Sequence, residues 1–147
     1  MVRHVLVPID GSEPAWRALD HAAAVFASDR ITVLHVVDPA AGTYTGVDGS
    51  YFDTEAFERA RTRGEELCER AIDRLRDDGM LEGGESELET AVEVGKPARA
   101  IVEYVSEHDV DHVVVGSRGR TGVSRLLLGS VAETVTRRSS VPVTVVR

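Results

Sequence analysis

A glycine-rich segment near the end of the chain has the residue types and the spacing that suit a bound anion. It runs from Gly116 to Ser130 with the sequence Gly-Ser-Arg-Gly-Arg-Thr-Gly-Val-Ser-Arg-Leu-Leu-Leu-Gly-Ser. Glycine lets a backbone approach a ligand closely, and unpaired N–H groups at a helix start point at negative charge. The segment also carries the arginines Arg118, Arg120 and Arg125. It predicts a phosphate site, with an ordinary solvated face as the alternative for the arginines.

The flanking residues predict a strand before this segment and a helix after it. Val110–Val115 is an apolar run typical of a buried strand, and Ser130–Arg138 has a helical pattern. Two better-known phosphate loops are absent from the sequence. There is no G-x-x-x-x-G-K-[ST], and the spacing Gly116-x-x-Gly119-x-x-Gly122 is not G-x-G-x-x-G and does not follow the first strand. What is left is Gly116-x-x-Gly119, nine residues, then Gly129-Ser130.

Strand and helix patterns alternate along the whole chain. The remaining strands are predicted over Val2–Ile9, Ile31–Val37, Glu87–Val94 and Val141–Val146, with helices after Ser12, over Glu55–Asp78 and from Pro97 to about His108. This alternation predicts one α/β domain over residues 1–147, an open parallel sheet with helices on both faces. Asp38–Thr54 reads as a long polar loop, of the kind that forms lids or flaps.

Ligands in such sheets bind outside the carboxyl ends of the strands, where the strand order reverses. Asp10 follows the first strand and Gly116 follows the fourth. If those two strands are neighbours, both residues line one crevice.

The composition argues against nucleic-acid-binding, membrane-spanning and secreted classes of protein. The chain has 147 residues, a formal net charge of -8 and a single cysteine, Cys68. A nucleic-acid-binding protein usually carries a basic face, and no apolar run approaches the ~20 residues of a membrane span. Met1–Val5 leads directly into a strand, so we expect no signal peptide. We therefore predict a cytoplasmic protein without nucleic-acid or membrane partners. Both a salt-rich cytoplasm and ordinary surface acidity are compatible with the charge.

The glycine spacing resembles that of the ATP-binding members of the universal stress protein family. The opening Val5–Ser12, the strand end Leu34–Val37 and the closing Pro142–Val146 are similar too, so the resemblance covers essentially the whole chain. It implies a five-stranded Rossmann-like sheet of the adenine nucleotide alpha hydrolase-like type. The implied strand order is 3-2-1-4-5, which places the first and fourth strands side by side.

The resemblance also implies a role for individual residues. Asp10 would contact the ribose hydroxyls or a phosphate-bound Mg²⁺, and the Val36 backbone would read the adenine edge. Pro8 and Ile9 would line the base pocket, and Val115 and Gly116 would flank the sugar. The phosphates would be held by the N–H groups of Gly119, Gly129, Ser130 and Val131. Contact between Arg118 and phosphate is our own inference from its charge.

Several residues have a plainer structural alternative. Asp10 could cap the turn after the first strand. Ser130 and Glu133 form an S-x-x-E capping box, so the serine hydroxyl would serve the helix while its N–H serves the ligand. His35 at a strand end is typical of a packed core histidine, and Cys68 of a small apolar group.

Three functions follow from this interpretation. The first is a regulatory or signalling module of the stress response that binds ATP, ADP or AMP, with Mg²⁺, without efficient turnover. The second is a slow ATP hydrolase, for which Asp10 is the only catalytic candidate. The third is a protein-interaction module that does not bind nucleotide. The strand order leaves the apolar strand Val141–Val146 at a sheet edge, which predicts a homodimer.

Overall fold

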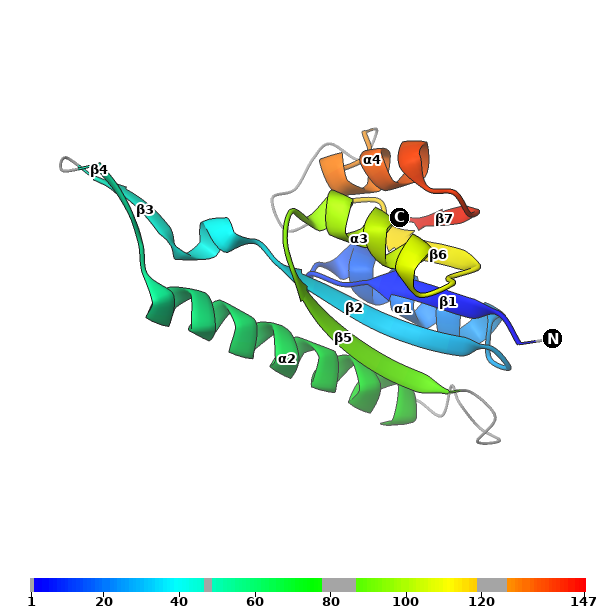
Figure 1. The fold of residues 1–147 in the computed structure, drawn as a ribbon. Coiled ribbons are helices and arrows are strands. Elements are labelled where there is room, and N and C mark those ends of the chain that lie inside the picture. The colour runs from blue at the N-terminus through cyan, green and yellow to red at the C-terminus, as the bar shows by residue number, and fades with distance from the viewer. Residues whose placement is uncertain (1, 47–48, 78–86, 119–126) are drawn as a thin grey trace.

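The computed structural model describes residues 2–46, 49–77, 87–118 and 127–147, and its centre is a five-stranded parallel sheet (Figure 1). The sheet strands are β1 (His4–Pro8), β2 (Arg30–Val37), β5 (Leu88–Val94), β6 (His112–Gly116) and β7 (Val143–Val146). Their spatial order is β5-β2-β1-β6-β7. Counted among the strands of this sheet alone, that is the predicted order 3-2-1-4-5. The labels differ because β3 and β4 form a separate sheet.

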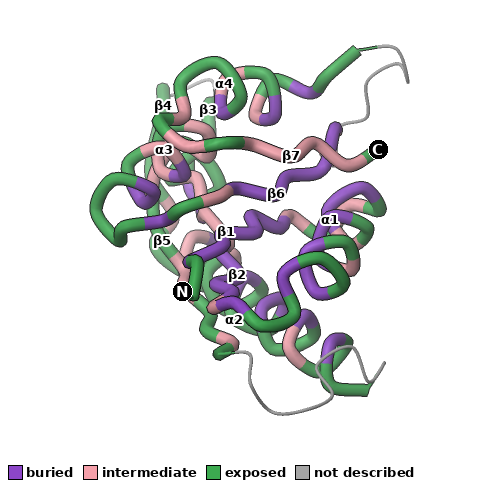
Figure 2. The backbone as a smooth tube through the Cα atoms, turned by 90° about the vertical axis from the view of Figure 1, so that its right-hand side faces the viewer, coloured by how far each residue is buried: buried purple, intermediate pink, exposed green. Residues whose placement is uncertain are grey.

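Helices cover both faces of the sheet, as predicted. These helices are α1 (Glu13–Val25), α2 (Thr54–Asp77), α3 (Pro97–Glu107) and α4 (Ser130–Arg138). One apolar cluster joins α1 and α2 to Val5 and Val7 of β1, and a second joins α3 and α4 to Leu6. Successive β1 residues thus point into opposite cores, which explains the two-sided apolar runs. Figure 2 shows the buried residues along β1 and β6. Within the described residues, no helix is long and apolar enough to cross a membrane.

The starts of α1 and α4 are built differently. Ser12 is the N-cap of α1, as predicted, and its hydroxyl accepts the Ala15 N–H at 3.4 Å. The capping box predicted at Ser130 is wrong. Gly129 is the N-cap of α4, there is no side-chain cap bond, and the Gly129 carbonyl accepts the Glu133 N–H. Ser130 is already inside the first turn, so its hydroxyl does not close the helix end.

The prediction of a long loop over Asp38–Thr54 is also wrong. A short 3₁₀ helix, η1 (Pro39–Gly42), leads into an antiparallel hairpin of β3 (Thr43–Gly46) and β4 (Gly49–Phe52). The rings of Tyr44 and Tyr51 stack across the two strands with centroids 5.4 Å apart. Aromatic and β-branched residues favour such cross-strand pairs. The hairpin projects away from the main sheet (Figure 1).

Candidate functional site

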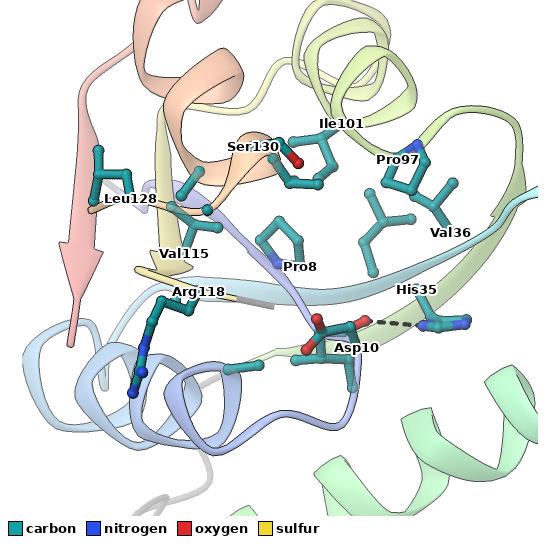
Figure 3. A pocket seen from close by; sticks show the side chains of 17 residues that line it. Pro8, Asp10, His35, Val36, Pro97, Ile101, Val115, Arg118, Leu128 and Ser130 are labelled. Atoms are coloured by element: carbon teal, nitrogen blue, oxygen red, sulfur yellow. Dashed lines mark hydrogen bonds between the residues drawn. The ribbon is translucent and has the colours of Figure 1, made fainter. Parts of the chain in front are cut away.

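A cavity of about 560 Å³ opens at the carboxyl ends of β1, β2 and β6 (Figure 3). β1 pairs with β6 in the register Val5↔His112 and Leu6↔Val113, so the first and fourth sheet strands are neighbours. The crevice expected from the sequence therefore exists. It is lined by Pro8, Ile9, Asp10, Ala15, Leu34, His35, Val36, Pro97, Ile101, Val115, Gly116, Arg118, Leu128, Gly129, Ser130, Val131 and Ala132.

One part of the cavity is apolar. Pro8, Val36, Ile101 and Val115 surround it from β1, β2, α3 and β6 (Figure 3). Ile101 and Val115 are almost fully buried. Pro8, Val36 and Val115 were predicted here, whereas Ile101 was missed because nothing in the sequence places α3 beside the strand ends. Such a slot suits a flat group with little charge, such as an aromatic base.

The backbone of Val36 adds a donor and an acceptor to this slot. Along β2, residues facing β1 alternate with residues facing β5. The carbonyl of Leu34 accepts the Ile9 N–H at 2.8 Å, so Leu34 faces β1, and Val36, two residues on, faces the same side. Because the β1–β2 pairing ends at Pro8↔Leu34, Val36 lies beyond the end of β1. Its peptide groups are therefore directed toward the cavity.

The start of α4 forms the other end of the cavity. The N–H groups of Ser130 and Val131 belong to the first helical turn, where no helix carbonyl pairs with them. The Ser130 hydroxyl lies at the cavity (Figure 3). The Gly129 N–H, in contrast, donates to the Ser117 carbonyl at 2.7 Å. An anion at this end would meet the N–H groups of Ser130 and Val131 first.

Asp10 caps the turn after β1, as the structural alternative predicted, and it also borders the cavity; its contact with a ligand stays a prediction. One carboxylate oxygen accepts the Ser12 N–H at 3.0 Å, which fixes the turn between β1 and α1. The same residue lines the cavity below Pro8 (Figure 3). Within the described residues there is no group of three or more histidine, cysteine, aspartate or glutamate side chains that would hold a metal.

Arg118 borders the cavity, but its side chain extends toward α1 and away from Ser130 (Figure 3). Its carbonyl accepts the Ser12 hydroxyl at 3.4 Å. Arg118 also lines a second cavity of about 330 Å³ beside Arg17 and Arg147. Gly119, Arg120 and Arg125 lie outside the described residues. Contact of Arg118 or Gly119 with a phosphate stays a prediction.

His35 is a lining residue that the sequence interpretation assigned to the core. Its ring is partly buried, and Nδ1 lies 2.9 Å from the Ile9 carbonyl oxygen. The ring packs against α2 at Gly64, where an added Cβ would lie 2.5 Å from the histidine Cδ2. In the sequence, its position next to Val36 at the end of a strand could have indicated that it lines the cavity. Cys68, in contrast, packs in the core as predicted.

Gly116 allows β6 to approach the start of α1. A Cβ at this position would lie 2.7 Å from the Pro14 carbonyl carbon and 2.8 Å from the Ala15 nitrogen. Only a residue without a side chain fits between these backbone atoms. The absence of a side chain at Gly116 therefore allows the turn before α1, which contains Asp10, to lie against the end of β6.

A sequence model of the universal stress protein family matches residues 1–147. The chain belongs to the universal stress protein family. It is 31% identical to the universal stress protein YxiE of Bacillus subtilis over 154 residues, covering 100% of both chains.

Solved universal stress proteins share this fold. The structure of UspA from Lactobacillus plantarum superposes with a TM-score of 0.77 at 25% identity, covering 99% of this chain and 97% of that one. A universal stress protein solved in complex with cAMP is 27% identical, with a TM-score of 0.70 and coverage of 99% and 97%.

Proposed function

We propose that this universal stress protein binds an adenine nucleotide in the cavity between β1, β2 and α4 and acts as a regulatory module of the stress response without efficient turnover. The observation that carries the proposal is the pairing, in one cavity, of an apolar slot with the N-terminus of a helix. A base suits the first and a phosphate the second. The cAMP complex of a relative supports the same ligand class.

The base would occupy the slot beside Pro8 and Val36, with the Val36 backbone reading its edge. Val115 and Gly116 would flank the sugar, and Ile9 and Asp10 would lie on the opposite side. The N–H groups of Ser130 and Val131 would hold a phosphate. A bond from the Gly129 N–H would require its present bond to Ser117 to open.

The energetics favour moderate affinity. Two N–H donors to a charged phosphate contribute about 3–6 kcal/mol at roughly 1.5–3 kcal/mol each. Association costs about 4–15 kcal/mol in lost freedom. Burial of the base must therefore supply the rest of the binding free energy. We expect dissociation constants in the micromolar range.

A magnesium ion would arrive with the nucleotide. Asp10 is the one carboxylate among the described lining residues. Mg²⁺ commonly takes one or two carboxylates together with substrate phosphates and water. This donor set fits an ion held mainly by phosphates, with Asp10 as its contact to the protein.

Efficient hydrolysis would need a group that orients water at the terminal phosphate. The described lining offers Asp10 and His35, and His35 Nδ1 is already bonded to the Ile9 carbonyl. A phosphate-release assay decides between the alternatives. We expect a rate near background. A robust rate that is lost in Asp10→Ala would establish the hydrolase instead.

The edge strand β7 is proposed to pair with β7 of a second copy. The Pro142 carbonyl accepts the N–H of Val113 in β6, and the Val146 carbonyl accepts the N–H of Ser117, which follows β6. Backbone direction alternates along a strand, so the peptide groups of Val143 and Val145 face outward. An apolar edge of this kind suits pairing with another chain.

Substitutions at Ser130 test the phosphate end directly. Gly129 has φ −65° and ψ 159°, which suits a following proline, and proline is favoured in the first position of a helix. Ser130→Pro therefore removes one N–H with little cost to the helix, and Ser130→Ala controls for the hydroxyl.

Calorimetry with ATP, AMP and adenosine gives the readout. Relative to Ser130→Ala, we expect Ser130→Pro to weaken ATP and AMP about 10- to 100-fold, the equivalent of one charged hydrogen bond, and to leave adenosine unchanged. Equal loss for adenosine would contradict the phosphate assignment. Absence of any nucleotide binding by the unaltered protein would favour the interaction-module function.

A further inference from the structure

We propose that His35 is a positioning residue for the nucleotide site: its imidazole holds the Ile9 carbonyl and thereby leaves the Val36 N–H available to a ligand. The proposal rests on the function inferred above and assigns a further residue to that site.

The ladder stops one bond short of its regular pattern. In a parallel pair, a residue whose N–H bonds one carbonyl normally offers its own carbonyl to an N–H two residues further along the partner strand. The Ile9 N–H donates to Leu34, so the regular partner of the Ile9 carbonyl would be the Val36 N–H. In the described part of the chain the Ile9 carbonyl receives no backbone hydrogen bond.

The imidazole of His35 takes that place. Its Nδ1 lies 2.9 Å from the Ile9 carbonyl oxygen. Because a carbonyl can only accept, Nδ1 must carry the proton, which defines the tautomer of a neutral ring. The dashed line in Figure 3 marks this bond, beside Val36 and Asp10. The side chain thus satisfies a carbonyl that would otherwise draw the Val36 N–H into the ladder.

Gly64 of α2 makes room for the ring. Glycine inside a helix is destabilising relative to alanine, yet Gly64 lies within a helix of 24 residues. An added Cβ there would lie 2.5 Å from His35 Cδ2 and 3.2 Å from Nε2. Alanine would therefore displace the imidazole without replacing any residue that lines the cavity.

The hydrogen bond between His35 and the Ile9 carbonyl also affects Asp10, which follows Ile9 in the chain. Ile9 is held through its N–H by Leu34 and through its carbonyl by His35. This fixes the direction in which the chain leaves β1, just before the Asp10 carboxylate bonds the Ser12 N–H. The two sides of the base and sugar site are positioned by the same imidazole.

Three variants test the role. His35→Asn keeps an N–H donor at about the position of Nδ1, His35→Leu removes it, and Gly64→Ala moves the ring from the α2 side. We expect His35→Leu to weaken AMP and ATP at least 10-fold, His35→Asn to stay within about threefold of the unaltered protein, and Gly64→Ala to fall between them. Nucleotide affinity is measured well below the unfolding temperature of each variant. If His35→Asn is as weak as His35→Leu, or if neither differs from the unaltered protein, the proposal is wrong.

Two measurements without ligand keep the test independent of nucleotide binding. Nitrogen NMR of the imidazole should show a proton on Nδ1 of His35. Amide hydrogen exchange at Val36 should be fast in the unaltered protein and slower in His35→Leu, where the Ile9 carbonyl becomes available. If the protein binds no nucleotide, only these two results decide the role of His35. A proton on Nε2 alone, or a Val36 amide equally protected in both proteins, would overturn it.

Discussion

The contact between Gly116 and the start of α1 gives the sharpest prediction for stability. In Gly116→Ala, the new methyl group would lie 2.7 Å from the Pro14 carbonyl carbon, 2.8 Å from the Ala15 nitrogen and 2.9 Å from the Pro14 oxygen. All three are backbone atoms, so no side-chain rotation can relieve the overlap. Either α1 or the end of β6 must move.

The size of the effect follows from this geometry. Overpacking a core with one methyl group typically costs about 1–3 kcal/mol, and backbone collisions belong at the upper end. At this chain length, a loss of 1 kcal/mol lowers the unfolding midpoint by roughly 2–4 °C. We expect Gly116→Ala to lose about 3 kcal/mol and roughly 6–12 °C.

Urea and thermal unfolding give the free energy and the midpoint. Gly49→Ala is a useful control, since its new methyl group meets nothing within 4 Å although Gly49 has φ +105°. Its cost should be confined to the β3–β4 hairpin, whose strands form a two-stranded sheet separate from the five-stranded one. A midpoint for Gly116→Ala within about 1 °C of the unaltered protein would refute the packing argument, because a collision this close must cost more.

Three further predictions concern charge, reactivity and assembly. Burial alone would raise the pKa of Asp29, but hydrogen bonds and charge from Arg3 hold it below its ordinary value. Arg3→Ala keeps the backbone hydrogen bond to Asp29 but loses the guanidinium contacts, so it should lose about 1 kcal/mol of unfolding free energy at pH 7. In urea titrations this difference should shrink as pH falls through the folded-state pKa of Asp29, leaving the contribution of the contact between Arg3 and the Phe26 ring. Burial raises the pKa of Cys68 to about 11; at pH 8 an aromatic disulfide reagent should react about 100-fold more slowly with native than with unfolded protein, and equal rates would contradict this. Val145→Pro removes an outward N–H of β7, so light scattering should show half the mass of the unaltered protein; an unchanged mass would exclude edge pairing through β7.

The sequence by itself determined the alternation of elements and the position of the glycine-rich segment between a strand and a helix. Apolar runs such as Val110–Val115 indicate strands of a parallel sheet, because such a strand is buried on both faces. The glycine spacing from Gly116 to Ser130 marked the end of a strand and the start of a helix, and both lie where expected. The neighbouring positions of the first and fourth strands came from the family resemblance, since local patterns do not specify which strands pair.

Tertiary structure decided what depends on contacts between distant segments. The rings of Tyr44 and Tyr51 stack across the two strands β3 and β4, a pairing that the polar composition of this segment does not reveal. The N-cap of α4 is Gly129 instead of Ser130, and the Gly129 N–H donates to the carbonyl of Ser117, a contact that the local pattern does not specify. His35 reaches the site because Gly64, on a helix far along the chain, leaves space for its ring.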